Sequence, residues 1–162
     1  MRILLQSPVK GHFLSVFSRF NRDLFEALKP PGIKMDILRF DGSKPGDIVH
    51  IRMKIPIIGV QEWISTITED VEEENRAWFT DTGEKLPSFL RYWKHRHIVS
   101  KNGKSSIITD DITYRTPSLF FDYLMYPVIY LQFAMRGPVY KKFFSQLPSI
   151  PPAEVNESLQ QQ

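Results

Sequence analysis

The stretch WKHRHIVSKNGKSSIITDDITYR, residues 93–115, predicts a β-hairpin and decides the fold of this chain. Its centre holds Asn102-Gly103, the strongest short-range signal for a two-residue turn between strands, because both turn residues need positive φ angles. If these two residues form the loop, His95 lies opposite Asp110 on the neighbouring strand. A three-residue loop would place Asp111 there instead, so an acidic neighbour is expected in either register.

The two faces of this hairpin differ in polarity. Side chains alternate along a strand, so one face carries Trp93, His95, His97, Ile108, Asp110, Ile112 and Tyr114. The opposite face carries Lys94, Arg96, Thr109, Asp111, Thr113 and Arg115. The first set is the more apolar, so we expect it to point inward and to bring an imidazole next to a carboxylate. Such a pair can tie two strands together, bind a ligand or move protons near neutral pH.

The rest of the chain supplies further strands and two helical regions. Strand-like runs cover residues 2–6, 33–40, 47–55, 60–70, 75–82, 93–101 and 105–115. Apolar residues at helical spacing predict one amphipathic helix from Phe13 to Leu28. A second helix is predicted over about residues 118–144, with Thr116 as N-cap and a bend or break at Pro127 and Pro138. Short turns between strands predict an antiparallel sheet, and therefore an α+β fold.

The predicted domain is single. We expect residues 1–147 to form one folded unit and residues 148–162, rich in Pro, Ser and Gln, to form a flexible C-terminal tail. Leu119–Met135 is apolar except for two residues and has the minimum length of a membrane span. Because nothing else in the chain resembles a membrane protein, we interpret it as a helix buried on most of its circumference.

Composition limits the classes of function. The chain has 162 residues, a net charge of +3 and no run of Lys or Arg longer than two, which argues against nucleic-acid binding. The absence of cysteine excludes disulfides and thiolate catalysis and fits a cytoplasmic protein. The N-terminus does not read as a signal peptide, and no transmembrane segment is predicted. No glycine-rich nucleotide motif occurs, so no cofactor is predicted.

A metal site is not predicted from the sequence. His95 and His97 are two residues apart and could share an ion, with His50 or Glu62 as further ligands. The alternation around His50 places it on the face expected to meet water, however, and zinc needs three or four converging ligands.

Residues 86–97, LPSFLRYWKHRH, followed by Asp110-Asp111-Ile112-Thr113-Tyr114 and Pro117, resemble the SRPBCC superfamily. This superfamily includes START lipid-transfer domains, the birch pollen allergen and polyketide cyclase/dehydrase-like proteins. The most similar branch has a W-x-H-x-H strand, and its domain also occurs fused to sugar-nucleotide epimerase-like proteins. The resemblance implies a helix-grip fold, in which a sheet of about seven strands wraps around a long C-terminal helix and leaves an apolar cavity. It implies no single reaction, because this fold serves carriers, receptors and enzymes.

Three functions are consistent with these observations. The first is a binding or carrier protein for a lipid-like or aromatic molecule, with apolar walls and a polar anchor. Its predicted ligand-binding residues are Trp63, Trp93, His95, His97, Asp110, Tyr114, Tyr123, Tyr126, Tyr130 and Phe133. The second is a cyclase- or dehydratase-type enzyme that uses His95 with Asp110 as acid and base. The third is a regulatory module that binds a protein partner. We favour the binding protein, which makes catalysis the less favoured interpretation.

Overall fold

The computed structural model describes residues 1–147, so the predicted tail at 148–162 lies outside the described residues. The strands are β1 (Arg2–Lys10), β2 (Lys34–Phe40), β3 (Ile48–Ile55), β4 (Gly59–Glu72), β5 (Arg76–Lys85), β6 (Tyr92–Asn102) and β7 (Ser105–Arg115). The helices are α1 (Phe13–Phe17), α2 (Arg22–Ala27), α3 (Leu119–Ala134) and α4 (Arg136–Phe143).

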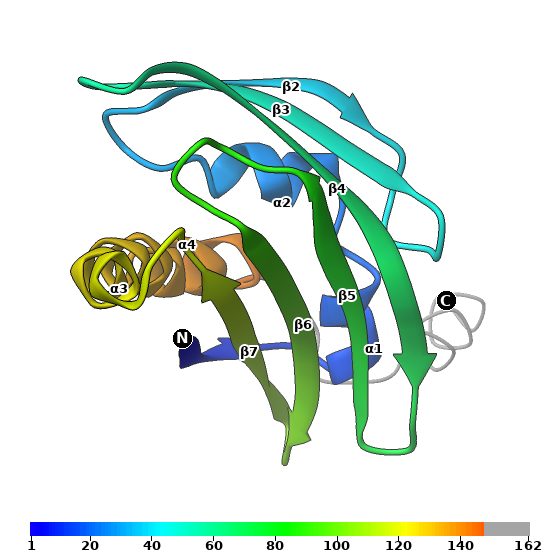
Figure 1. Ribbon diagram of the computed structural model, residues 1–162. Coiled ribbons are helices and arrows are strands. Elements are labelled where there is room, and N and C mark those ends of the chain that lie inside the picture. Colours follow the sequence, from blue (N-terminus) through cyan, green and yellow to red (C-terminus); the bar gives the residue numbers. More distant parts are fainter. Residues whose placement is uncertain (148–162) are drawn as a thin grey trace, which may run out of the picture.

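The seven strands form one antiparallel sheet in the order β1-β7-β6-β5-β4-β3-β2. Figure 1 shows this sheet curling from β2 and β3 at the top of the view to β7 and β1 below, with the helices on its concave side. Consecutive strands pair except for β1, which closes the far edge beside β7. The predicted α+β class and the helix-grip arrangement are therefore confirmed.

The β6–β7 hairpin keeps the predicted faces but has a different register. The loop consists of Gly103 and Lys104, and Asn102 stays in the ladder opposite Ser105. Only Gly103 has a positive φ, +61°, as in a turn that needs glycine at its first central position. The partner of His95 is therefore Ile112 rather than the predicted Asp110 or Asp111. A shift of two residues preserves which side chains share a face, so the Trp–His face still points inward.

The N-terminal helical region is two short helices rather than the single helix predicted. Asn21 takes an extended conformation between them, and its side chain accepts a hydrogen bond from the backbone N–H of Leu24. An asparagine that caps a new helix competes with continuation of the previous one. The apolar side chains predicted for the buried face, among them Phe13, Phe17 and Leu24, do enter the core.

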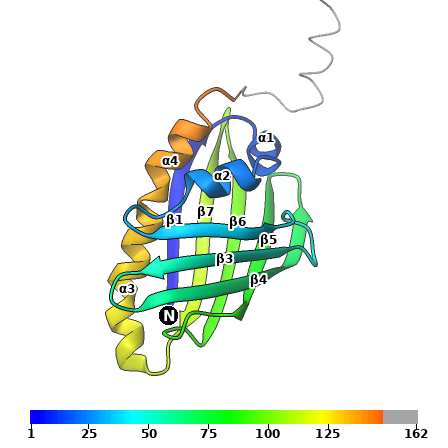
Figure 2. The same cartoon turned by 90° about the horizontal axis from the view of Figure 1, so that it is seen from above.

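The main core lies between these short helices, α4 and the inner face of β5, β6 and β7. Its buried members are Val9, Phe13, Val16, Phe17, Phe20, Leu24, Leu28, Ile67, Ala77, Phe79, Val99, Ile108, Tyr140 and Phe144. Figure 2 shows α1 and α2 at one end of the sheet and α3 and α4 running along its side.

The C-terminal helical region divides at a different point from the one predicted. Helix α3 continues through Pro127, although an interior proline removes one intrahelical hydrogen bond and crowds the preceding turn, and the break falls at Met135. Pro138 lies in the first turn of α4, where its missing N–H is no loss. The N-cap is Ser118, whose hydroxyl accepts from the N–H of Phe121, rather than Thr116.

Helix α3 is not buried on most of its circumference, so that interpretation was wrong. Only Asp122, Ile129 and Phe133 are buried, because α3 packs through one side against the edge of the sheet formed by β1 and β7. Large exposed apolar side chains on α3 and at its C-cap are Leu119, Phe120, Phe121, Tyr123, Leu124, Val128, Tyr130, Leu131 and Met135. Within residues 1–147, no helix has both the length and the hydropathy required to cross a bilayer.

Buried hydrogen bonds connect the start of α3 to the end of β7. The hydroxyl of Tyr114 donates to the backbone carbonyl of Asp122 at 2.7 Å, and the N–H of Thr116 donates to the Asp122 carboxylate at 2.6 Å. Tyr114→Phe leaves that carbonyl without its buried partner and should lower the free energy of unfolding by about 1–2 kcal/mol in urea titrations. The control Tyr130→Phe changes an exposed hydroxyl on the same helix and should have no measurable effect.

Candidate ligand-binding site

A pocket of about 310 Å³ lies between the curled sheet, α2 and α3. Its wall is mainly apolar and comes from both helices and strands: Leu24 and Phe25 from α2, Leu28 at the C-cap of α2, Met35 from β2, Val49, Ile51 and Met53 from β3, Trp63 and Ile67 from β4, Trp93 from β6, and Met125, Val128, Ile129 and Phe133 from α3. The size falls in the range of small-molecule sites, about 300–1,000 Å³.

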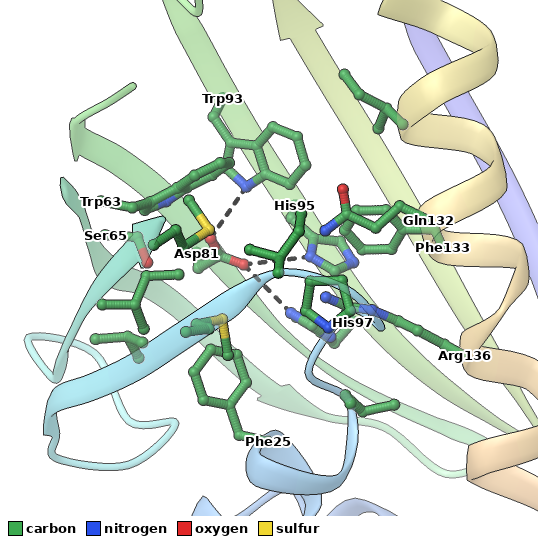
Figure 3. Close-up of a pocket in the computed structure, with 18 of the residues that line it drawn as sticks. Phe25, Trp63, Ser65, Asp81, Trp93, His95, His97, Gln132, Phe133 and Arg136 are labelled. Carbon is green, nitrogen blue, oxygen red and sulfur yellow. Dashed lines mark hydrogen bonds and ion pairs between the residues drawn. The ribbon is translucent and has the colours of Figure 1, made fainter. Parts of the chain in front are cut away.

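Trp93, His95 and His97 in the pocket wall point toward Asp81, as Figure 3 shows. Nε2 of His97 lies 3.2 Å from Oδ2 of Asp81, and Nδ1 of His95 lies 3.5 Å from the same oxygen. The other carboxylate oxygen, Oδ1, accepts a hydrogen bond from Nε1 of Trp93 at 3.2 Å. These residues come from the neighbouring strands β5 and β6, where Asp81 pairs directly with His95.

A second carboxylate lies behind the two histidines. Asp110 on β7 is 1% exposed, and its Oδ1 lies 2.9 Å from Nε2 of His95. The hydroxyl of Tyr140 donates to that oxygen at 3.3 Å, and the guanidinium of Arg136 lies 3.9 Å from it. Arg136 also covers the ring of Phe133, with 3.9 Å between the guanidinium carbon and the ring centroid.

The charges of this cluster follow from burial and from close partners. Burial alone would raise the pKa of Asp81 and Asp110, but hydrogen bonds to the histidines, together with nearby positive charge, outweigh it and hold both pKa values below the usual value. Burial, with the charge of His95 as a second cause, lowers the pKa of His97 to about 4. At neutral pH the cluster therefore contains two ionised carboxylates and a neutral His97.

The structure brings five of the ten predicted ligand-binding residues to the pocket wall. These are Trp63, Trp93, His95, His97 and Phe133. Asp110 is separated from the pocket by His95, which it contacts, and Tyr114 is fully buried at the start of α3. Tyr126 is partly buried beside Phe133 without lining the pocket, while Tyr123 and Tyr130 lie on the exposed face of α3.

Sequence reasoning missed Asp81 and gave Arg136 no role. Residues 77, 79 and 81 share the inward face of β5, so alternation from the buried Phe79 could have indicated that Asp81 points inward. Its contact with His95 could not be read, because residues 86–91 form an irregular connection that hides the β5–β6 register. The ligands considered instead, His50 and Glu62, pair with each other on the outer side of the sheet at 3.9 Å.

Comparisons with known proteins support the fold. No protein-family model and no curated protein matches the sequence. Among solved structures, norcoclaurine synthase from Thalictrum flavum is similar with a TM-score of 0.64 and 17% identity, over 90% of this chain and 87% of that one. Protein Ms6760 from Mycobacterium smegmatis is similar with a TM-score of 0.63 and 14% identity, over 88% of this chain and 89% of that one.

A third similarity concerns part of a larger protein. The nucleoside-diphosphate sugar epimerase from Corynebacterium glutamicum matches with a TM-score of 0.62 and 17% identity, over 86% of this chain but 28% of its own length. At these identities the comparisons show the fold alone. That fold is a helix-grip fold, in agreement with the fold that the resemblance noted in the sequence implied.

Proposed function

We propose that this protein binds an apolar small molecule in the pocket between the sheet and α3. The observation that carries the proposal is the chemistry of the wall, in which aliphatic and aromatic side chains surround the space and polar groups gather around Asp81. Apolar burial supplies affinity in such a site, and a few convergent polar groups orient the ligand. A solved structure of the same fold, a point mutant of norcoclaurine synthase, holds a transition-state analogue, which supports the proposal by analogy.

The three tryptophans of the chain allow a direct test. Trp63 and Trp93 line the pocket with their rings in edge-to-face contact, 4.7 Å between centroids. Trp78 does not line it and lies close to Arg76 and Arg96 instead. We expect the uncharged fluorophore N-phenyl-1-naphthylamine to bind with one-to-one saturation and to quench tryptophan emission. Native mass spectrometry of freshly purified protein would show whether an endogenous ligand is retained.

One single and one double tryptophan replacement provide the controls for this titration. The variant Trp78→Phe should keep the quenching, whereas combined Trp63→Phe and Trp93→Phe should abolish it while probe fluorescence still reports binding. Absence of saturable binding to the wild-type protein would rule out the proposal, as would quenching confined to Trp78.

A second candidate function is acid–base catalysis by His95. It is favoured by the 2.9 Å contact between His95 and Asp110, which can fix the imidazole tautomer while the ring borders the pocket. If mass spectrometry identifies a retained molecule, its conversion by wild type and by His95→Ala separates the two functions. An enzyme loses turnover in this variant, whereas a carrier converts nothing in either form and loses only part of its affinity.

A further inference from the structure

Asp81, His95 and His97 bring three metal-ligating side chains together at one point of the pocket wall. The carboxylate and the two imidazoles each offer one donor atom, and the three atoms lie within 4.8 Å of one another. Nitrogen and oxygen ligands of zinc stand about 2.0–2.2 Å from the ion, so two of them at a tetrahedral angle are roughly 3.4 Å apart. The distances from Oδ2 of Asp81 to Nε2 of His97 and to Nδ1 of His95, 3.2 and 3.5 Å, fit that separation.

The surroundings of these groups match those of metal ligands in proteins. A metal-binding histidine commonly gives its other ring N–H to a carboxylate, which orients the ring and makes it a better donor. Asp110 stands in this relation to His95, because its Oδ1 lies 2.9 Å from Nε2 and leaves Nδ1 for an ion. Trp93 holds the second oxygen of Asp81 through its Nε1–H. Neighbouring side chains therefore hold both the His95 imidazole and the Asp81 carboxylate in position to coordinate an ion.

The balance of charge also favours a cation at this point. Among residues 1–147, the only basic side chains within 4 Å of the Asp81 carboxylate are the two imidazoles, whereas Asp110 has Arg136 nearby. Each imidazole lies between two carboxylates, with His97 Nδ1 3.7 Å from Asp110. A cation held between these side chains would be attracted by the Asp81 carboxylate directly and by the Asp110 carboxylate behind the rings.

We propose that Asp81, His95 and His97 form a binding site for one divalent first-row transition-metal ion, with Zn²⁺ as the reference ligand. Two nitrogens, one oxygen and no sulfur suit Zn²⁺, Co²⁺ and Ni²⁺ better than Ca²⁺ or Mg²⁺. All three residues line the pocket, so the remaining coordination positions would face the cavity, as in metal sites that keep an open position. The sequence predicted no metal site because Asp81, the third ligand, was not recognised.

Cobalt titration of the full chain tests the proposal. Protein freed of metal by a chelator, with the chelator then removed, should bind Co²⁺ with one-to-one saturation and develop a visible absorption band stronger than that of the aqueous ion, which reports four or five ligands in place of six waters. Zn²⁺ should displace the cobalt. The variants Asp81→Asn and His97→Gln should each lose the band, and Asp110→Asn should weaken binding by about 10–100-fold. The matched control His50→Gln removes a histidine on the outer side of the sheet and should bind as the wild type does.

Imidazole ¹⁵N spectra of the wild-type protein make the outcome independent of variants that fail to fold. The chain has four histidines, and Zn²⁺ should shift Nδ1 of His95 and Nε2 of His97 while leaving the nitrogens of His50 unchanged. Absence of saturable binding by the wild type would overturn the proposal, as would shifts at His50 instead of His95 and His97. Metal binding is measured without an organic ligand, so its failure leaves the apolar-ligand proposal standing, and the converse also holds.

Discussion

Replacing Asp110 with alanine is expected to destabilise the protein by about 3–5 kcal/mol, the cost of removing one partner from a buried ionic network. Asp110 is almost completely buried, and its Oδ1 lies against His95, Tyr140 and Arg136 at 2.9, 3.3 and 3.9 Å. Without the carboxylate, the largely buried guanidinium of Arg136 keeps its charge and loses its neighbouring anion, while its contact with the ring of Phe133 remains. Equilibrium unfolding in urea with metal-free protein measures the change.

The adjacent residue supplies a matched control. Asp111 points to the opposite face and forms two hydrogen bonds of 2.8 Å with the exposed guanidinium of Arg2. An ion pair between exposed groups stabilises a protein by about 0–1 kcal/mol, so Asp111→Ala should have a small effect. Similar decreases in the free energy of unfolding for Asp110→Ala and Asp111→Ala would contradict the prediction, because the buried network would then stabilise the protein no more than a surface ion pair does.

Filling the pocket should remove ligand binding without removing the fold. Ser65 on β4 is buried, borders the pocket and is the smallest side chain on its β4 wall, between Trp63 and Ile67. In Ser65→Phe the ring would occupy space that the ligand needs, and we expect the dissociation constant for N-phenyl-1-naphthylamine to rise at least tenfold, which corresponds to about 1.4 kcal/mol or more. A cooperative unfolding transition would show that the variant is folded.

The control for this substitution lies one residue further along the strand. Thr66 faces the outer side of the sheet, where its hydroxyl contacts Glu84, so Thr66→Phe adds the same ring outside the pocket. Its affinity for the probe should match that of the wild type. Unchanged affinity in a folded Ser65→Phe variant would show that the probe binds somewhere else.

Much of the fold could be predicted because strand periodicity and turn residues are local signals. The run at 105–115 coincides with β7, and the alternation around Trp93 correctly placed the tryptophan and both histidines on the inner face. The register of the hairpin was misjudged by two residues, since only Gly103 needed a positive φ. That error preserved the faces because a strand repeats every two residues.

The exposure of α3 could not be predicted from its composition. An apolar helix is buried on most of its circumference only when other elements surround it, and here α3 packs through one side against the edge of the sheet formed by β1 and β7. For the same reason, two of the tyrosines predicted to line a cavity are exposed instead. Tyr123 and Tyr130 lie on the side of α3 that no other described element covers.

The sequence by itself determined the class of fold and the inward direction of the tryptophan–histidine strand, since both depend on spacing between nearby residues. Tertiary structure alone decided that Asp81 meets His95 and His97, because β5 and β6 are aligned by pairing across an irregular connection rather than by a turn motif. The chemistry of the pocket therefore depends on a long-range register, and its apolar wall depends on how α2 and α3 pack against the curled sheet.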